Sequence, residues 1–274
     1  MTTLKFVDGQ PRVAVQVEGN GPPVIFLHGI GGNRSNWRLQ MAALSASYTC
    51  MAWDARGYGA SDDYDGALDF SAFGDDLRRL FDQFGIARAH LVGLSMGARI
   101  LMDFAPRHLD LVATLTLCDC FYGFENALTP DKQREFIELR ERPLREGKTF
   151  ADLAPRLIQS LVSPNCSPEV RQELHESILQ LRVDSYLKTL RASTTFDQQD
   201  TLHLLEMPIQ LIFGSEDRLT PPELGAKLQT MLNDARLSVL EGAGHLSNLE
   251  APKAFNSTIR GFLDEHRNLA SYTD

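Results

Sequence analysis

The sequence predicts an α/β fold with a mostly parallel central sheet, helices on both of its faces and a helical segment inserted between two strands. Three observations lead to this prediction. Short apolar runs, such as 23–27 and 209–213, alternate with segments of helical periodicity. These runs are apolar at nearly every position, which is typical of parallel strands buried on both faces. The segment 121–195 interrupts the alternation, because it contains helical patterns and no convincing strand.

Read in chain order, the apolar runs and the periodic segments define the expected elements. Strands are expected at 13–17, 23–27, 48–53, 90–92, 112–117, 209–213 and 237–240, and core helices at 70–84, 95–104 and 254–263. Ser71 is the expected N-cap of the first of these helices and Gly85 its expected end. The polar tail from Asn268 onward is expected to fray.

The inserted segment is expected to form a cap over the sheet. Helical patterns occupy 131–142, 150–162, 168–181 and 183–192, separated by proline and glycine. Ligands of parallel sheets bind beyond the carboxyl ends of the strands, where such a cap would shape a pocket. We therefore expect a core formed by 1–120 and 196–274, and a cap formed by 121–195.

Size and charge restrict the class of protein. The chain has 274 residues, 43% of them hydrophobic and 23% charged, which suits one large domain with an insertion. A net charge of −9 argues against nucleic acid and anionic membrane surfaces as partners, because both are bound by clustered Lys and Arg. An anionic small molecule is not excluded, since a single buried Arg can hold it. A small-molecule substrate is expected, and the sequence leaves the oligomeric state open.

The cysteines and the N-terminal segment point to a cytoplasmic protein without a metal or cofactor. Cys118 and Cys120 form only a C-x-C pair, and no second Cys/His pair stands at the spacing of a zinc site. The N-terminus lacks the charged and apolar regions of a signal peptide, and no apolar run is long enough to span a bilayer.

Ser95 is the candidate nucleophile. Residues 93–97, Gly-Leu-Ser-Met-Gly, fit the pattern G-x-S-x-G, with an apolar strand before and a helix after. The two glycines allow a sharp turn that presents the serine hydroxyl, and the turn directs the N–H of Met96 toward a developing oxyanion. This context favours a catalytic role over an ordinary glycine-rich turn.

A serine nucleophile needs a base and an acid, expected downstream in the order acid, then histidine. Asp217 follows the strand at 209–213 and is the expected acid, whereas Glu216 is expected in solvent. Asp119, at the end of the preceding strand, is a rival acid. His245 follows the last strand in a glycine-rich turn and is the expected general base.

A second glycine-rich turn is expected to complete an oxyanion hole. His28-Gly29-Ile30-Gly31-Gly32 comes directly after a strand. The N–H of Ile30 is the expected donor, paired with the N–H of Met96.

These motifs together resemble the α/β-hydrolase superfamily over nearly the whole chain apart from the cap. They comprise His28-Gly29, residues 54–62 (Asp-Ala-Arg-Gly-Tyr-Gly-Ala-Ser-Asp), the elbow at 93–97, residues 214–217 and Gly244-His245. The elbow and residues 244–255 are similar to 3-oxoadipate enol-lactonases in particular. One departure is that Ala98-Arg99 follows Gly97 where that group usually has another glycine, which either narrows the pocket or changes how the helix packs.

Candidate substrate-binding residues follow from position alone. Arg56, Arg99 and Arg218 lie nearest the expected site, and each could instead form a structural ion pair. Arg99 is the one we assign to substrate binding. Trp37 is assigned with it, because it follows the oxyanion turn, although it could equally belong to the core.

The resemblance implies a serine hydrolase acting on an ester or lactone of a small carboxylic substrate. The same residues would serve hydrolysis of C–C bonds in products of aromatic-ring cleavage. A receptor that binds a small ligand without turnover is the alternative from a different class, because such receptors of this fold often keep the triad.

Overall fold

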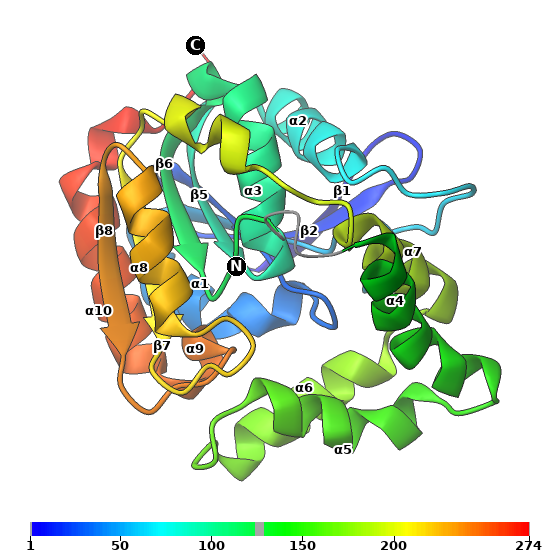
Figure 1. Cartoon of the computed structure of the whole chain (residues 1–274). Coiled ribbons are helices and arrows are strands. Elements are labelled where there is room, and N and C mark those ends of the chain that lie inside the picture. The colour runs from blue at the N-terminus through cyan, green and yellow to red at the C-terminus, as the bar shows by residue number, and fades with distance from the viewer. Residues whose placement is uncertain (1, 124–128, 274) are drawn as a thin grey trace.

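The computed structural model describes residues 2–123 and 129–273, and its centre is a twisted sheet (Figure 1). The strands lie in the order β1-β2-β4-β3-β5-β6-β7-β8. All neighbours from β4 to β8 pair in parallel, whereas β1 and β2 join one edge in antiparallel fashion. The bounds are β1 Thr3–Val7, β2 Val13–Glu18, β3 Pro23–Leu27, β4 Thr49–Trp53, β5 Ile86–Leu94, β6 Val112–Cys118, β7 Ile209–Gly214 and β8 Ala235–Leu240.

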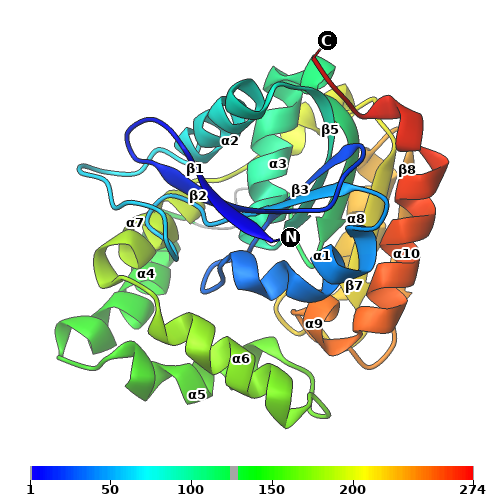
Figure 2. The ribbon, with the colours of Figure 1, turned by 180° about the vertical axis from the view of Figure 1, so that it is seen from behind.

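Helices cover both faces of the sheet (Figures 1 and 2). One apolar layer packs α2 (Ala72–Phe84), α3 (Met96–Arg107) and α8 (Pro222–Met231) against one face. A second layer packs α1 (Arg38–Leu44) and α10 (Pro252–Glu265) against the other face and continues into the cap. The predicted fold class is confirmed.

The cap lies between β6 and β7 and contains four helices in its described part. These are α4 (Pro130–Arg145), α5 (Phe150–Leu161), α6 (Pro168–Leu179) and α7 (Val183–Ser193). The side chains of Thr149 and Ser167 accept hydrogen bonds from backbone N–H groups at the starts of α5 and α6. Both residue types are preferred at this position, so they favour a helix start there. Figure 1 shows the cap on the side of the sheet toward which the β6 and β8 arrows point. Part of its expected range, 124–128, lies outside the described residues.

The two ends of the cap meet at a narrow neck. Gly123 and Asp197 form an isolated antiparallel bridge, and the N–H of Gln198 donates to the carbonyl of Tyr122 at 2.9 Å. The chain therefore leaves the core and returns to it at almost the same point.

Three local expectations need correction. Ser71 is the N-cap residue of α2, but its side chain makes no capping hydrogen bond, because its hydroxyl donates to Asp69 at 2.8 Å; Gly85 ends the helix with a φ of 60°, as expected. α3 starts at Met96, one residue after the expected start. The tail does not fray at Ser271–Tyr272, which forms β9 and pairs with the start of β5.

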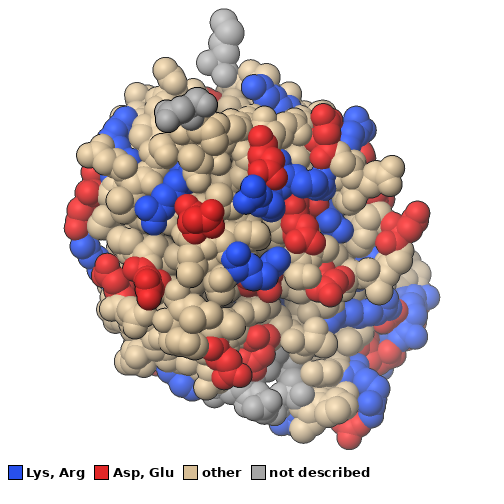
Figure 3. Space-filling view, turned by 90° about the horizontal axis from the view of Figure 1, so that it is seen from above, with Lys and Arg blue, Asp and Glu red and all other residues tan. Residues whose placement is uncertain are grey.

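Two features bear on the expected partners: the distribution of charge on the surface and the apolar character of the helices. On the face shown in Figure 3, Lys and Arg are interspersed with Asp and Glu and do not gather in one basic region. None of the described helices is long and apolar enough to cross a membrane.

Candidate active site

The candidate nucleophile Ser95 lies in a sharp turn between β5 and α3. Its φ of 53° and ψ of −109° are strained for a residue with a side chain. Both flanking glycines are needed for steric reasons. A Cβ on Gly93 would lie 2.4 Å from the carbonyl carbon of Gly97, and a Cβ on Gly97 would lie 2.1 Å from the carbonyl oxygen of Leu27. The turn thus holds the Ser95 side chain at the carboxyl end of the sheet.

His245 and Asp217 form a buried pair in the loops after β8 and β7. Nδ1 of His245 lies 2.8 Å from Oδ2 of Asp217, and both residues are almost fully buried. Thr220 donates its hydroxyl to the same carboxylate oxygen at 2.5 Å. The N–H groups of Leu219 and Thr220 donate to the other oxygen at 2.8 and 3.0 Å. The carboxylate is therefore fixed by four donors, and it in turn fixes the imidazole ring.

The pKa values of the pair shift in opposite directions. Burial by itself raises the pKa of Asp217, but the hydrogen bond and the charge of His245 outweigh burial, so this pKa is lowered. Burial lowers the pKa of His245, but the bond to Asp217, the charge of Asp217 and the smaller effects of Asp119 and Glu250 together outweigh burial, so this pKa is raised. The arrangement stabilises an imidazolium, which is the form that appears when His245 accepts a proton.

The loop after β3 lies against the nucleophile. A Cβ on Gly29 would lie 3.2 Å from the Cβ of Ser95. Nδ1 of buried His28 lies 2.8 Å from the Gly29 carbonyl, and Nε2 accepts the N–H of Ala55 at 3.1 Å. The ring is therefore neutral with its proton on Nδ1, in keeping with a pKa that burial lowers. His28 thus holds this loop against the segment that follows β4.

The N–H groups of Ile30 and Met96 remain available for an oxyanion. The Gly29 carbonyl accepts both the His28 ring and the N–H of Gly32 at 3.1 Å, so the peptide that carries the Ile30 N–H is held in one orientation. The N–H of Met96 is the first of α3 and has no partner within the helix. Neither N–H donates to another group in the described part of the chain.

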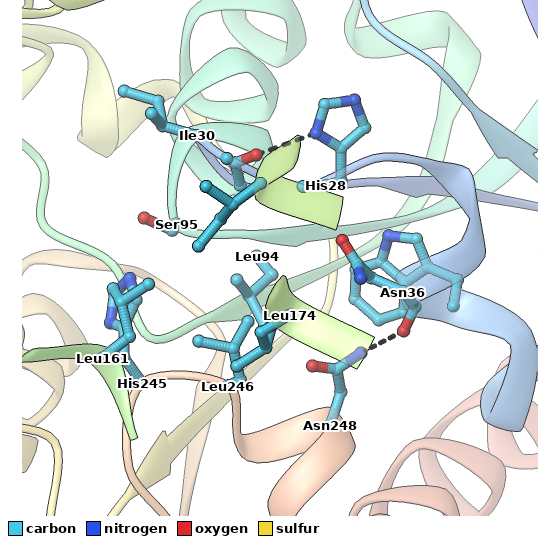
Figure 4. Close-up of a pocket in the computed structure, with 15 residues that line it drawn as sticks. His28, Ile30, Asn36, Leu94, Ser95, Leu161, Leu174, His245, Leu246 and Asn248 are labelled. Atoms are coloured by element: carbon cyan, nitrogen blue, oxygen red, sulfur yellow. Dashed lines mark hydrogen bonds between the residues drawn. The ribbon is translucent and has the colours of Figure 1, made fainter. Parts of the chain in front are cut away.

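Two adjoining cavities meet at these residues. The smaller, of about 40 Å³, is shown in Figure 4, and the larger, of about 520 Å³, extends under the cap. Ser95, His245 and Ile30 line both of them. Figure 4 draws Ser95 and His245 on the same cavity without a hydrogen bond between them. Such bonds often tighten only when substrate is bound.

The rival acid, Asp119, occupies a different place. Its carboxylate accepts the N–H of Gly214 at 2.8 Å and the hydroxyl of Ser247, and it makes no hydrogen bond to His245 among the described contacts. Burial raises the pKa of Asp119 to about 8. It ties together the two loops that carry Asp217 and His245, so the geometry favours Asp217 as the acid.

The four candidate substrate-binding residues differ in their surroundings. Arg56 forms a buried ion pair with Asp76 at 2.6 Å, and Arg218 donates to backbone carbonyls of the cap, so both are structural. Trp37 lines the smaller cavity, but its ring packs 5.1 Å from that of Phe26 and belongs to the core. Arg99 lines the larger cavity.

Thr220 and Glu250 were missed by sequence reasoning. A threonine three residues after an aspartate is a common turn pattern, which could have identified Thr220. Glu250 accepts hydrogen bonds from the N–H of Gly244 at 3.1 Å and from the N–H of Ser163 in the cap at 2.8 Å. The contact with Ser163 joins segments far apart in the sequence, and no sequence motif predicts it. The described residues contain no group of His, Cys, Asp and Glu that could hold a metal ion.

A parallel sheet with a strained serine after β5, a buried His–Asp pair after β7 and β8 and a cap over their loops defines the α/β hydrolases as a class. The chain matches a family model described as "Alpha/beta hydrolase family" over residues 24–258. It belongs to this family. The predicted resemblance and the predicted enzyme class, a hydrolase, are confirmed.

Relatives and solved structures agree with this assignment. The 3-oxoadipate enol-lactonase 2 of Acinetobacter baylyi is 26% identical over 95% of this chain and 96% of its own length. The structure of a malate-bound thermophilic esterase from Thermogutta terrifontis matches with a TM-score of 0.87 and 26% identity, covering 97% of this chain and 99% of that one. The enol-lactonase from Burkholderia xenovorans shares the fold, with a TM-score of 0.85 at 24% identity over 95% of this chain and all of that one.

Proposed function

We propose that this protein hydrolyses an ester or lactone bond of a small carboxylic substrate, with Ser95, His245 and Asp217 as its triad. The observation that carries the proposal is the meeting of three groups at one cavity. These are the strained Ser95, the imidazole of His245 held by Asp217, and the loop of Ile30. Relatives that are named esterase and enol-lactonase support the choice of bond.

The proposed reaction proceeds in two acyl-transfer steps. The Ser95 oxygen forms a bond to the substrate carbonyl carbon while its proton passes to Nε2 of His245. The N–H groups of Ile30 and Met96 hold the resulting oxyanion, and such donors typically lower the barrier by a few kcal/mol. The bond to the leaving alcohol or enolate then breaks, and that oxygen takes the proton from His245.

Water completes the cycle. It gives a proton to His245 as its oxygen bonds to the acyl carbon. The second tetrahedral intermediate breaks its bond to the Ser95 oxygen, which recovers the proton, and a carboxylic acid leaves. Asp217 stays ionised throughout, because the imidazolium and three further donors, from Leu219 and Thr220, stabilise its charge.

Hydrolysis of p-nitrophenyl acetate by the wild type and by Ser95→Ala tests the proposal. We expect the substitution to lower kcat/KM by about 10⁴-fold or more with an unchanged Tm. A fluorophosphonate should label the wild type and not the variant. Ser271→Ala, in exposed β9, is a matched control that should keep full activity.

A second assay separates the alternatives left open by the sequence. Enol-lactones, simple esters and vinylogous diketones from ring cleavage are offered in parallel. If only the diketones are turned over, the protein is a C–C bond hydrolase and the proposal of ester or lactone hydrolysis is wrong. Binding without turnover of any of them, and without labelling of Ser95, would indicate a receptor.

A further inference from the structure

Arg99 places a positive charge beside the nucleophile. It lies one turn after Ser95 on α3, and its backbone N–H donates to the Ser95 carbonyl at 3.1 Å. Its side chain lines the 520 Å³ cavity that Ser95 and His245 also line. Only 4% of the residue is exposed. Arg99 therefore borders the space in which the acyl part of a substrate would lie.

No carboxylate neutralises this charge within the described residues. Among the described residues, its side chain makes one hydrogen bond, from Nη2 to the carbonyl of Ser193 at 2.6 Å, and its Nε finds no partner there. The rings of Phe196, Phe121 and Phe70 surround it with centroids 4.3, 4.6 and 5.4 Å from the guanidinium carbon. Burial lowers its pKa to about 9, so it remains charged at neutral pH.

A buried cation without an anion is unfavourable, and proteins rarely keep one unless a partner arrives. The surroundings add to the positive charge. Arg140 also lines the cavity, stacks on the Phe136 ring and donates to the Phe136 carbonyl at 3.0 Å. No Asp or Glu is among the described residues that line the cavity, although the chain as a whole carries a net charge of −9.

We infer that Arg99 binds a carboxylate at the far end of the acyl group, so that the substrate is a monoester or lactone of a short dicarboxylic acid. This inference rests on the proposed function, since it places the scissile carbonyl at Ser95. The α-carbons of Ser95 and Arg99 are about 6 Å apart along the helix, which suits a chain of a few carbons. Leu157, Leu181 and Leu190 offer apolar walls for that chain.

The competing explanation is purely structural. Ser193 is the last residue of α7. In this explanation, the sole role of Arg99 is to hold the carboxyl end of α7 against the core. The two roles differ in what a charge-removing substitution does. A structural role predicts equal losses with all substrates, whereas carboxylate binding predicts losses only with anionic ones.

The test compares p-nitrophenyl hemiglutarate, which is anionic, with p-nitrophenyl pentanoate, its neutral match in length. We expect Arg99→Gln to lower kcat/KM for the hemiglutarate by about 10- to 100-fold and for the pentanoate by less than about 3-fold. Arg99→Lys should restore part of the loss. Arg236→Gln removes an exposed arginine and should change neither value. If Arg99→Gln lowers kcat/KM equally for both esters, the assignment is wrong. It is also wrong if Arg140→Gln, and not Arg99→Gln, removes the preference for the anionic ester.

A binding experiment separates this inference from the proposed function. Ser95→Ala protein is titrated calorimetrically with glutarate and with neutral glutaramide. Binding of glutarate alone, abolished by adding Arg99→Gln, supports the carboxylate site even if the wild type hydrolyses no ester. Equal binding of the two compounds, or no binding of glutarate, contradicts the site even if esters are hydrolysed.

Discussion

The backbone N–H of His245 donates a 2.7 Å hydrogen bond to the carbonyl of Leu161, the last residue of the cap helix α5. The proposed general base is therefore attached directly to the cap. Arg218, next to Asp217, donates to the carbonyls of Gln159 and Val162 at 3.0 and 3.3 Å. The carboxyl end of α5 is thus held by both loops that carry Asp217 and His245, and we expect cap stability and catalysis to be coupled.

Removing the Glu250 carboxylate should loosen this attachment. Glu250→Ala leaves the N–H groups of Gly244 and Ser163 without their acceptor, which we expect to cost about 1–3 kcal/mol of stability. Hydrogen exchange should quicken at 159–163 and at 244–246, with kcat/KM falling. Glu223→Ala, at an exposed position of α8, is the control. Unchanged exchange in both segments would show that Glu250 does not hold the cap.

The pH dependence of activity should report the His245–Asp217 pair. Activity needs neutral His245, whose pKa is raised by Asp217 against the effect of burial, so kcat/KM should fall as pH drops through a value above about 6.5. Asp217→Asn removes the raising charge. The acid limb should move to lower pH, and kcat should fall by about 10⁴-fold because the tautomer is no longer fixed. If the acid limb of the pH profile stays at the same pH in Asp217→Asn, Asp217 does not set the pKa of the base.

Asp119→Asn should be far milder than Asp217→Asn. Asparagine can still accept the Gly214 N–H through its oxygen and can donate to the Ser247 hydroxyl, so both loop contacts survive. We expect kcat/KM within about 10-fold of the wild type at pH 8. Steady-state kinetics on the two variants decide the matter. An equal collapse of activity would reopen the choice of acid.

The same variant should change how stability depends on pH. The pKa of Asp119 is raised by burial to about 8, far above an unfolded value of about 3.9, so the folded state favours its protonated form. The corresponding stability is fully present below pH 4 and is lost as pH rises toward 8. Denaturation with urea at several pH values should show Asp119→Asn gaining stability relative to the wild type over this range. A constant difference would mean that Asp119 is ionised in the fold.

Gly97→Ala should disrupt the nucleophile turn. Its new Cβ would lie 2.1 Å from the Leu27 carbonyl oxygen, and backbone cannot move aside cheaply. We expect a loss of about 1–3 kcal/mol in stability and a large loss of activity. Gly261→Ala is the matched control, since a Cβ there meets nothing within 4 Å and alanine favours the helix. Equal Tm values for both variants would show that the turn tolerates a side chain.

The sequence predicted the sheet and the proposed triad because the signals for both are local. A buried parallel strand such as β3 is apolar at every position, and the turns around Ser95 and His245 need glycine for steric reasons. Strand β1 escaped prediction because it lies at the sheet edge, where most of Thr3–Val7 is exposed and the apolar pattern is weak. Its pairing with β2 depends on backbone hydrogen bonds and not on a motif.

The contacts of the cap could not be predicted in the same way. Leu161 and His245 are far apart in the sequence and join through backbone atoms, which every residue type possesses. Arg56, Arg99 and Arg218 looked equivalent by position. Their surroundings in the folded chain differ. Arg56 contacts Asp76, Arg218 contacts backbone carbonyls, and Arg99 contacts aromatic rings.

The closed neck at Gly123 and Asp197 makes the cap an exchangeable module. Because the chain leaves and re-enters the core at adjacent points, inserts of different length close their loop at little added entropic cost. A different cap, with different side chains around the acyl group of the substrate, can therefore be inserted at this neck without changes to the sheet. The replacement must still offer one carbonyl to the N–H of His245.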